Sequence, residues 1–400
     1  MKILMVTPYL PYPPASGGQI RTLNLLKYLS YGNEITLVSL YKNDEEKKYL
    51  SYLKPYCKSI HVCKRAEKPW QMEIIAKSVF SRKPFLVVRN YSTEAKEVLE
   101  KLVKEKKFDV IHAETFYIMP HIPQTSIPVL LVEQTIEFKV YQHFVDSLPF
   151  IIKPFFSIDI LKLKHWERYY WKKASLVGAV SEADRKLIMQ LEPSIKPVVI
   201  PNGAGEEMIV NRLNPKKIKR PIILFQGNFA WLQNTEAANY LINKIYPVIK
   251  KTISGAKIII AGQSAKSKIN ISPDPNIEVV DIPPDNTSLV KKMYQQATIF
   301  AAPIFGPGGT RLKILAAMSA GLPVISTKVG LEGLDVKDKE NVLIANQPDD
   351  FARKIKQILN NKDLYNKIRK NAYLLVKDKY NWKKIAEKLE IIYTKIKKQL

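Results

Sequence analysis

The chain has 400 residues, of which 46% are hydrophobic and 25% are charged. This composition argues against intrinsic disorder, and the length suits two domains. The two cysteines, Cys57 and Cys63, exclude a disulfide scaffold and match no zinc or redox motif. No apolar stretch approaches the roughly 20 residues of a membrane span, and the run after Lys2 is too short for a signal-peptide core. We therefore expect a cytoplasmic protein, at most peripheral at the inner face of the membrane.

The net charge of +26 comes from 63 basic and 37 acidic side chains. Such an excess is compatible with an anionic membrane surface, with nucleic acid or with phosphate-bearing substrates. A lysine-rich composition without a function of its own explains it equally well. Because no nucleic-acid-binding module is recognisable, we expect no nucleic-acid partner.

Short apolar strands alternate with amphipathic helices in the first half of the chain. Lys2–Thr7 predicts a buried parallel strand. The helix that follows begins near Gln19 and has one apolar face. A helix at 183–191 has Ser181 as its expected N-cap, and another is expected at 93–106. Further strands are expected at 34–40, 60–63, 110–113, 129–132, 176–180 and 198–201.

The same order restarts after a polar, basic stretch at 211–221. A helix is expected at 235–251, and strands at 222–226, 257–261, 277–280, 299–302, 324–327 and 342–345. This repetition predicts two doubly wound parallel sheets, in a first Rossmann-like domain over 1–210 and a second over 211–380. The last segment, 381–400, is an amphipathic helix that needs another surface to cover its apolar face.

Residues 138–173 depart from this alternation because they mix aromatic side chains with lysines. Such a mixture suits an interfacial helix that contacts lipid headgroups. A helix that covers the sheet would have nearly the same composition, so both interpretations stay open.

Two glycine-rich turns between a strand and a helix are the candidates for chemistry, since no GxGxxG, Walker A, HExxH or serine-elbow motif is present. In the first, Gly17 and Gly18 precede a helix. Glycines there let backbone N–H groups approach a phosphate or a sugar, and the helix N-terminus adds its partial positive charge. The same two glycines also suit a simple loop end.

The second turn, GPGGT at 306–310, leads into Arg311 and Lys313. Cations at a helix N-terminus are unfavourable without an anion. A departing nucleoside diphosphate carries concentrated negative charge, which fixed donors stabilise. Arg311 can hold two of its oxygens, while Lys313 supplies a compact point charge. The turn therefore predicts a diphosphate site.

Residues 308–327 and the KVGLEGLDV that follows resemble the nucleotide-sugar signature of family 4 glycosyltransferases of the GT-B type. The resemblance extends over nearly the whole chain. FQGNFAWLQNTEA at 225–237 is similar to the loop that opens the family's C-terminal domain. The segments FDVIHAE, VSEADRKLI and VVIPNGA fit in the same order at 108–114, 180–188 and 198–204.

The resemblance implies a GT-B-like α/β fold, with two Rossmann-like domains facing across a cleft and the helix at 381–400 crossing back to the N-terminal domain. It implies a retaining glycosyltransferase that moves a sugar from a UDP- or GDP-sugar to a saccharide, lipid-linked or other glycoconjugate acceptor. Neither a metal nor another cofactor is required. Arg311 and Lys313 would neutralise the leaving diphosphate. The donor would be bound by Gly17, Gly18, Gly227, Asn228, Gly308, Gly309 and Thr310.

Two departures from the family pattern concern carboxylates and a histidine. Relatives carry two glutamates at the positions of Gly308 and Ala316, and the second usually bonds the ribose; its loss removes about 1.5–3 kcal/mol of charged hydrogen bonding. Gln134 stands where relatives often have a histidine, and Glu137 matches a carboxylate found just beyond it. We treat His112, Gln134 and Glu137 as candidate acceptor or sugar contacts. For His112 a structural role fits equally well, and for Glu137 so does a helix N-terminal charge.

The alternative is a catalytically weakened or non-catalytic relative that acts as a sugar-nucleotide-binding or scaffold protein. Ala316 and Gln134, which stand where relatives have a glutamate and a histidine, favour it. A sugar-nucleotide epimerase of the same architecture would need acid–base carboxylates and histidines, and the five histidines form no obvious set. The sugar, the nucleotide base and the acceptor do not follow from residue spacing.

Overall fold

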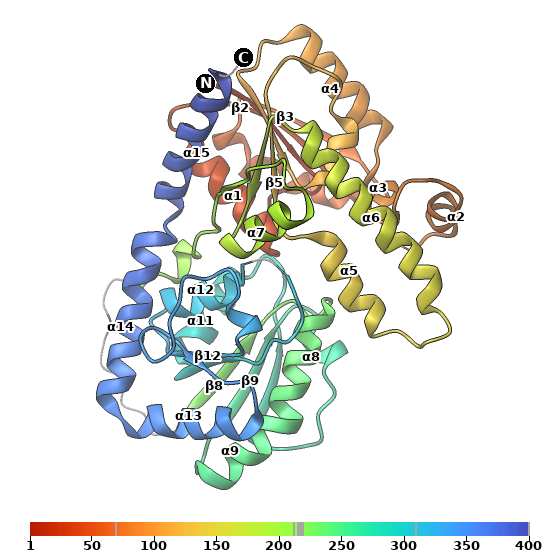
Figure 1. The fold of residues 1–400 in the computed structure, drawn as a ribbon. Coiled ribbons are helices and arrows are strands. Elements are labelled where there is room, and N and C mark those ends of the chain that lie inside the picture. The colour runs from red at the N-terminus through yellow and green to blue at the C-terminus, as the bar shows by residue number, and fades with distance from the viewer. Residues whose placement is uncertain (69, 211–212, 214–219, 309, 399–400) are drawn as a thin grey trace. The chain divides into compact units, whose positions relative to one another are not determined.

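The computed structural model describes residues 1–68, 70–210, 213, 220–308 and 310–398. The chain forms two compact units (Figure 1). Unit 1 contains Met1–Pro201, Gly308–Thr310 and Trp382–Leu400, and unit 2 contains Asn202–Pro307 and Arg311–Asn381. The main segment of unit 1 thus ends at Pro201, whereas we expected a boundary at 210. Most of the basic stretch at 211–221 lies outside the described residues.

Unit 1 is built on a seven-stranded parallel sheet in the order β3-β2-β1-β4-β5-β6-β7. Its central strands are buried almost end to end, as expected for a parallel sheet covered by helices on both faces. The strands are β1 Lys2–Thr7, β2 Glu34–Tyr41, β3 Ser59–Lys64, β4 Val110–Glu114, β5 Val129–Glu133, β6 Leu176–Ala179 and β7 Val198–Val199.

The C-terminal helix α15 (Trp382–Lys397) buries its apolar face within unit 1, where it contacts α1 (Gly17–Leu29). Leu389 and Tyr393 share a core cluster with Leu25. Helix α1 begins at Gly17, earlier than expected, because Ser16 caps it. The expected helices at 93–106 and 183–191 are α4 (Thr93–Glu105) and α7 (Glu182–Leu191), the latter capped by Ser181 as predicted.

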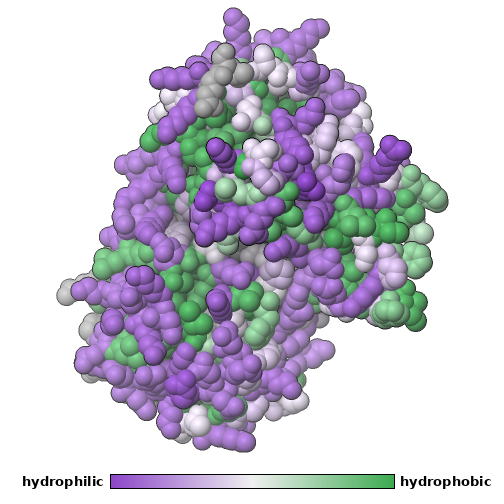
Figure 2. Space-filling view, viewed as in Figure 1, coloured by the Kyte–Doolittle hydropathy of each residue, from purple (hydrophilic) through white to green (hydrophobic). Residues whose placement is uncertain are grey.

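The aromatic, lysine-rich segment forms two helices, α5 (Glu137–Asp146) and α6 (Lys153–Lys173). The buried residues of α6 include Leu163 and Trp171, which join the core of unit 1. Near its start, Phe155 and Leu161 are exposed. Figure 2 shows hydrophobic surface gathered over α2 (Met72–Phe80) and over the turn that joins α5 to α6. One helix therefore combines a core-covering part with an exposed apolar part.

The segment between β2 and β4 also contains elements that the sequence did not predict. They are η1 Asp44–Tyr52, η2 Lys54–Tyr56, α2 and α3 Phe85–Asn90, and η3 Phe116–His121 follows β4. These pieces are short, and Pro55 and Pro120 interrupt the apolar periodicity on which the prediction depended.

Unit 2 is built on a six-stranded parallel sheet in the order β10-β9-β8-β11-β12-β13. Its strands are β8 Ile222–Gln226, β9 Lys257–Gly262, β10 Ile277–Asp281, β11 Ile299–Ala302, β12 Val324–Ser326 and β13 Leu343–Ile344. Its helices are η4 Glu206–Met208, α8 Leu232–Tyr240, η5 Leu241–Ile245, α9 Tyr246–Thr252, α10 Ala265–Lys268, α11 Thr287–Gln296, α12 Leu312–Ser319, η6 Val329–Leu331, α13 Pro348–Asn360 and α14 Lys362–Lys379.

The prediction of a single helix at 235–251 is partly wrong, because the segment is divided into three pieces. Helix α8 already begins at Leu232, a turn of π-helix follows at Leu241–Ile245, and α9 restarts with Pro247 in its first turn. Proline lacks the N–H of a regular α-helical bond, so a local change of hydrogen bonding is expected there. Nowhere in the described part of the chain is a helix long and apolar enough to cross a membrane.

Candidate functional site

The turn after β11 places Arg311 at the N-cap position of α12. Its side chain is 9% exposed, and its Nη2 donates a hydrogen bond of 2.6 Å to the carbonyl of Gly306. The guanidinium is therefore held against the glycine-rich turn that precedes the helix. The first turn of α12 has no acidic residue, so its N-terminal N–H groups and Arg311 combine their positive charge.

Lys313, in the first turn of α12, is held by Asn234 from the first turn of α8. Its Nζ donates to the Oδ1 of Asn234 and lies 5.0 Å from the centre of the Phe225 ring. Burial, followed by the nearby charge of Arg311, lowers the pKa of Lys313 to about 7. An anion bound beside it would favour the charged form and raise that pKa again.

Gly227 lies directly beside this pair. A Cβ atom at this position would lie 2.9 Å from the Nζ of Lys313 and 3.1 Å from the Cγ of Asn234, so both side chains would have to shift. Gly262, with φ of +146°, approaches the same loop, and its Cβ would lie 1.8 Å from the carbonyl oxygen of Gly227. Gly262 therefore needs glycine, because backbone atoms stand where its Cβ would be.

Asn228 shapes the same loop through its own bonds. Its Nδ2 donates to Gln263 at 2.8 Å, and its Oδ1 accepts from the backbone of Ala230 at 3.0 Å. The Nδ2 of Asn234 donates to the carbonyl of Asn228 at 2.7 Å. The structure thus brings Gly227, Asn228 and Lys313 together through Asn234. Sequence reasoning missed Asn234, although it lies in the segment 225–237 that carries the family resemblance.

The other residues of the second glycine turn are placed differently. Gly308 has φ of +140°, which favours glycine, and Gly309 lies outside the described residues. Thr310 is buried, and its Oγ1 donates to the carbonyl of Val180 at 3.4 Å within unit 1. Ala316 is partly buried on α12 and packs against the unit 2 core.

In unit 1, Gly18 lies against two polar side chains. A Cβ atom at Gly18 would lie 2.1 Å from the Oη of Tyr9 and 2.5 Å from the Oε1 of Gln134. The Nε2 of Gln134 donates to the Tyr9 hydroxyl and to Glu114, each at 2.6 Å. Gly17, by contrast, is exposed at the start of α1. The structure therefore brings Gly18 and Gln134 together.

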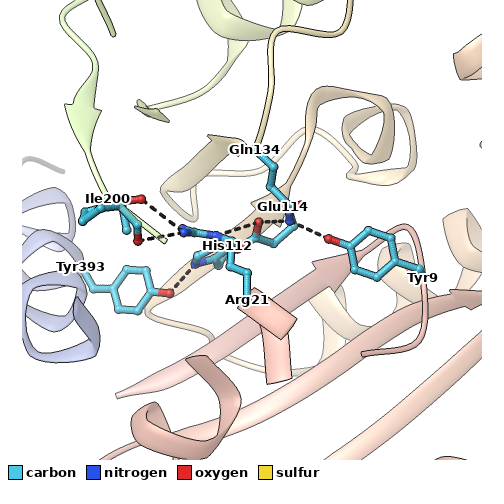
Figure 3. A network of polar contacts seen from close by, with 8 residues as sticks. Tyr9, Arg21, His112, Glu114, Gln134, Ile200 and Tyr393 are labelled. Carbon is cyan, nitrogen blue, oxygen red and sulfur yellow. Dashed lines mark hydrogen bonds and ion pairs between the residues drawn. The ribbon is translucent and has the colours of Figure 1, made fainter. Parts of the chain in front are cut away.

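Figure 3 shows the buried network around Glu114, which links α1, β4 and α15. The Nε of Arg21 donates to both carboxylate oxygens at 3.1 and 3.3 Å, and its Nη1 donates to the backbone carbonyls of residues 200 and 201. Burial opposes ionisation, but Arg21 and His112 outweigh it and lower the pKa of Glu114 to about 2. The carboxylate is thus the anionic centre of the network.

The same network engages both ring nitrogens of His112. Its Nε2 lies 2.9 Å from Glu114, and its Nδ1 is bonded to the hydroxyl of Tyr393. The side chain has no exposed surface. These contacts favour the structural interpretation of His112. Sequence reasoning missed Arg21, Glu114 and Tyr393, because residues far apart in sequence meet here.

Glu137 begins α5, is partly buried, and lies near the buried carboxyl groups of Glu133 and Glu167. Burial raises the pKa of Glu137 to about 7, against the opposing charge of Arg89. Burial likewise raises the pKa of Glu133 and of Glu167. Glu167 accepts bonds from the backbone N–H groups of Glu137 and Phe138 at 2.7 and 3.1 Å, so it caps the helix. Among the residues that the structure describes, no group of three His, Cys, Asp or Glu side chains is placed to hold a metal ion.

Comparison with known proteins bears on the family and on the fold. Residues 220–361, within unit 2, match the family described as Glycosyl transferases group 1. The chain is 24% identical over 398 residues to an uncharacterized 44.6 kDa protein in the cps region of Klebsiella pneumoniae, with 96% of this chain and 97% of that protein covered.

Solved structures cover almost the whole chain. A glycosyltransferase from Rickettsia africae matches with a TM-score of 0.66 at 17% identity, over 99% of this chain and 98% of that one. Anabaena HepE, solved in complex with UDP and glucose, matches with a TM-score of 0.69 at 13% identity, over 99% and 100%. At such identities the likeness shows the fold, which is the GT-B arrangement of two parallel-sheet Rossmann-like domains. Together with the matched domain it supports a GT-B glycosyltransferase.

Proposed function

We propose that the protein is a retaining glycosyltransferase of family 4 type that transfers a sugar from a UDP- or GDP-sugar to a saccharide, lipid-linked or other glycoconjugate acceptor. The observation that carries the proposal is the pair Arg311 and Lys313, held beside the loop that begins at Gly227. Two cations fixed by Gly306 and Asn234 stand at a helix N-terminus, where they are unfavourable unless an anion is bound.

The chemistry that this pair can perform is stabilisation of a leaving diphosphate. Negative charge develops on the β-phosphate as the glycosidic bond to the donor breaks, and preorganised cations in a partly buried site lower that barrier. Lys313, with its pKa near 7, becomes fully charged when the diphosphate binds. These side chains can supply the charge that a metal ion supplies elsewhere, so we propose a metal-independent reaction. Retention is proposed from the family resemblance, and no enzymic nucleophile is assigned.

Relatives favour a nucleotide sugar as the donor. HepE was solved with UDP and with UDP-glucose, and WaaG is described as a glycosyltransferase involved in lipopolysaccharide biosynthesis. The Klebsiella pneumoniae relative is described by its place in the cps region. We therefore propose a role in polysaccharide or glycolipid synthesis in the cytoplasm.

Calorimetric titration with UDP and with GDP, without divalent metal, tests the donor site. We expect one of them to bind, and Arg311→Ala to weaken its binding at least tenfold. The matched control is Arg353→Ala, which removes an exposed arginine paired with Asp350 in the same unit. Thermal unfolding of each variant checks folding. Absence of binding for either nucleotide at millimolar concentration would refute the donor site.

Ala316 favours the second candidate, a non-catalytic relative that binds a sugar nucleotide. Where relatives have a ribose-binding glutamate, this chain has a methyl group that is partly buried on α12. Ala316→Glu should strengthen nucleotide binding if the ribose lies there. Transfer or slow donor hydrolysis by the wild type, measured as release of UDP or GDP from nucleotide sugars, would establish the enzyme. Tight nucleotide binding with no release in either protein supports the non-catalytic relative.

We also propose that unit 1 contacts an anionic membrane surface. The exposed apolar surface joins α2 to α6, where Lys162 donates to the carbonyls of Ser78 and Ser81 at 2.8 Å. Its exposed members are Trp70, Met72, Val79, Phe80, Phe150, Ile151, Phe155, Ile158 and Leu161. Exposed aromatic and aliphatic side chains on a protein of net charge +26 suit interfacial binding.

Co-sedimentation with vesicles tests this surface. We expect binding to vesicles that contain phosphatidylglycerol, weaker binding in high salt, and a loss of binding in the double variant Phe80→Ser, Phe150→Ser. Leu374→Ser is the control, since Leu374 is about half exposed on α14 in unit 2. Equal sedimentation of all three proteins would contradict the proposal.

A further inference from the structure

Three cationic side chains of unit 1 belong to neither group of site residues described so far. Lys42 directly follows β2, and Arg65 directly follows β3. The two strands are parallel neighbours, and the backbone N–H of Arg65 donates to the carbonyl of Tyr41 at 3.0 Å. Arg89 comes from the last turn of α3. The pair Lys42 and Arg65 thus lies at the carboxyl edge of the sheet, where ligands of parallel α/β sheets bind.

Buried nitrogen atoms of the two arginines lack hydrogen-bond partners, while Lys42 and Arg89 as whole side chains are partly buried. Arg65 is only 8% exposed, and its Nε and Nη1 have no partner among the described residues. The Nε of Arg89 is also buried without one. No described carboxylate lies within ion-pairing distance of these two arginines or of Lys42. Buried guanidinium groups are normally paired, so this arrangement needs an explanation.

The three charges are close enough to repel one another. Burial, followed by Arg65, lowers the pKa of Lys42. Burial, followed by Arg89, lowers the pKa of Arg65 to about 10. Glu46 opposes both shifts, and Glu137 faces Arg89 from α5, but neither carboxylate is close enough to pair. The region therefore keeps an excess of positive charge, which is buried at Arg65 and partly buried at Lys42 and Arg89.

Two tyrosines lie beside this cationic cluster of Lys42, Arg65 and Arg89. Arg89 lies within hydrogen-bonding reach of the Tyr141 hydroxyl. Tyr117 interacts electrostatically with Arg65 and with Tyr9, and Tyr9 is the residue that a Cβ at Gly18 would meet. Tyr117 thus links the cationic cluster electrostatically to the Tyr9–Gln134 contact.

We propose that the cationic cluster of Lys42, Arg65 and Arg89 binds an oxyanion carried by the acceptor, either a phosphate ester or a carboxylate. A neutral saccharide would leave the buried Nε and Nη1 of Arg65 without a charged partner, whereas an oxyanion can accept bonds from the fork of an arginine. This proposal rests on the proposed function only for the role of the ligand as acceptor; binding of the anion itself does not depend on transfer.

Thermal unfolding and calorimetry of the full chain, with saturating UDP to occupy the donor site, test anion binding by the cationic cluster. The probes are glycerol phosphate, glucuronate, inorganic phosphate and the neutral control methyl glucoside. We expect glycerol phosphate or glucuronate to bind, methyl glucoside not to bind, and Arg65→Met to weaken anion binding at least tenfold while leaving the Kd of UDP unchanged. Arg168→Met is the matched control, because Arg168 is surface-exposed and paired with Glu192 at 3.0 Å.

The outcomes separate the sources of the anion. Tighter binding of inorganic phosphate than of both organic anions would overturn the acceptor assignment, and so would equal binding in wild type and Arg65→Met. If Arg65→Met does not fold, Arg89→Met and Arg65→Lys replace it; Arg65→Lys keeps the charge but loses the bidentate geometry. If UDP does not bind, the donor site is refuted instead of the anion site. The anion titrations are then repeated without UDP, and the same comparison of wild type with Arg65→Met tests the cationic cluster.

Discussion

Lys313 makes nucleotide binding depend on pH in a way that can be calculated. Its pKa in the free protein is about 7. About half of the protein then carries the charge at pH 7, and only about 1 molecule in 100 carries it at pH 9. If the diphosphate binds only the charged form, the apparent Kd of UDP should rise about 50-fold between these pH values, or roughly 2.3 kcal/mol.

The nucleotide itself contributes little to this change, because a terminal phosphate with a pKa near 6 is already ionised above pH 7. At pH 8, binding should take up about 0.9 proton, from the same ionisation of Lys313. Calorimetry at pH 7, 8 and 9, in two buffers of different ionisation enthalpy, measures both the Kd and the proton uptake. Lys313→Met should bind UDP weakly with a flat profile. A wild-type Kd that changes less than about threefold, without proton uptake, would refute the reasoning.

A rise in pH should weaken nucleotide binding through Lys313, but it should increase the free energy of unfolding of the free protein. Its pKa is lower in the folded protein than the usual 10.5, so the unfolded chain binds more protons between pH 7 and 10.5. This contribution to the free energy of unfolding therefore rises with pH across that window. Below pH 7 the buried charge is a full penalty, and Lys313→Met should be more stable there by about 2–4 kcal/mol, allowing for partial exposure. Urea denaturation at pH 6 and pH 9 measures the difference.

Three further variants test unit 1 by urea denaturation. Gly18→Ala places a Cβ within 2.1 Å of a tyrosine hydroxyl and should cost about 1–3 kcal/mol, whereas Gly32→Ala, with its nearest neighbour at 3.5 Å, should cost less. Tyr393→Phe removes the hydrogen bond to the Nδ1 of His112 and should cost about 1–3 kcal/mol. Glu114→Gln should cost about 3–5 kcal/mol. Because the pKa of Glu114 falls to about 2, its stabilising contribution persists above pH 4.5 and is lost as pH falls towards 2.

Much of the fold could be predicted from local patterns. The strands expected at Lys2–Thr7 and Ile222–Gln226 have those bounds in the structure, because a parallel strand buried on both faces is a continuous apolar run. The N-cap at Ser181 was equally local. The helix expected at 235–251 was partly wrong, since apolar periodicity does not reveal a π turn or where a helix restarts at a proline.

The candidate site also has residues that the sequence indicates and residues that only the structure assigns. Arg311 and Lys313 stand out in the sequence because two cations at a helix start are unfavourable, and that inference needs only a few neighbouring residues. Asn234 could not be assigned without the structure, because its bond to Lys313 joins the first turns of two helices, α8 and α12, that follow different strands. The lowered pKa of Lys313 depends on burial, which is likewise a property of the folded chain.

By itself, the sequence determined the α/β class, two parallel sheets and a cationic, glycine-rich turn, since each of these is written in residues close together in the chain. Only the tertiary structure decided which distant side chains meet. It joined Arg21, Glu114 and Tyr393 around His112, and it gathered Lys42 with two arginines in one partly buried cluster. The physical reason is that parallel strands bring their carboxyl ends to one edge of the sheet, while burial and charge at that edge depend on every element packed there.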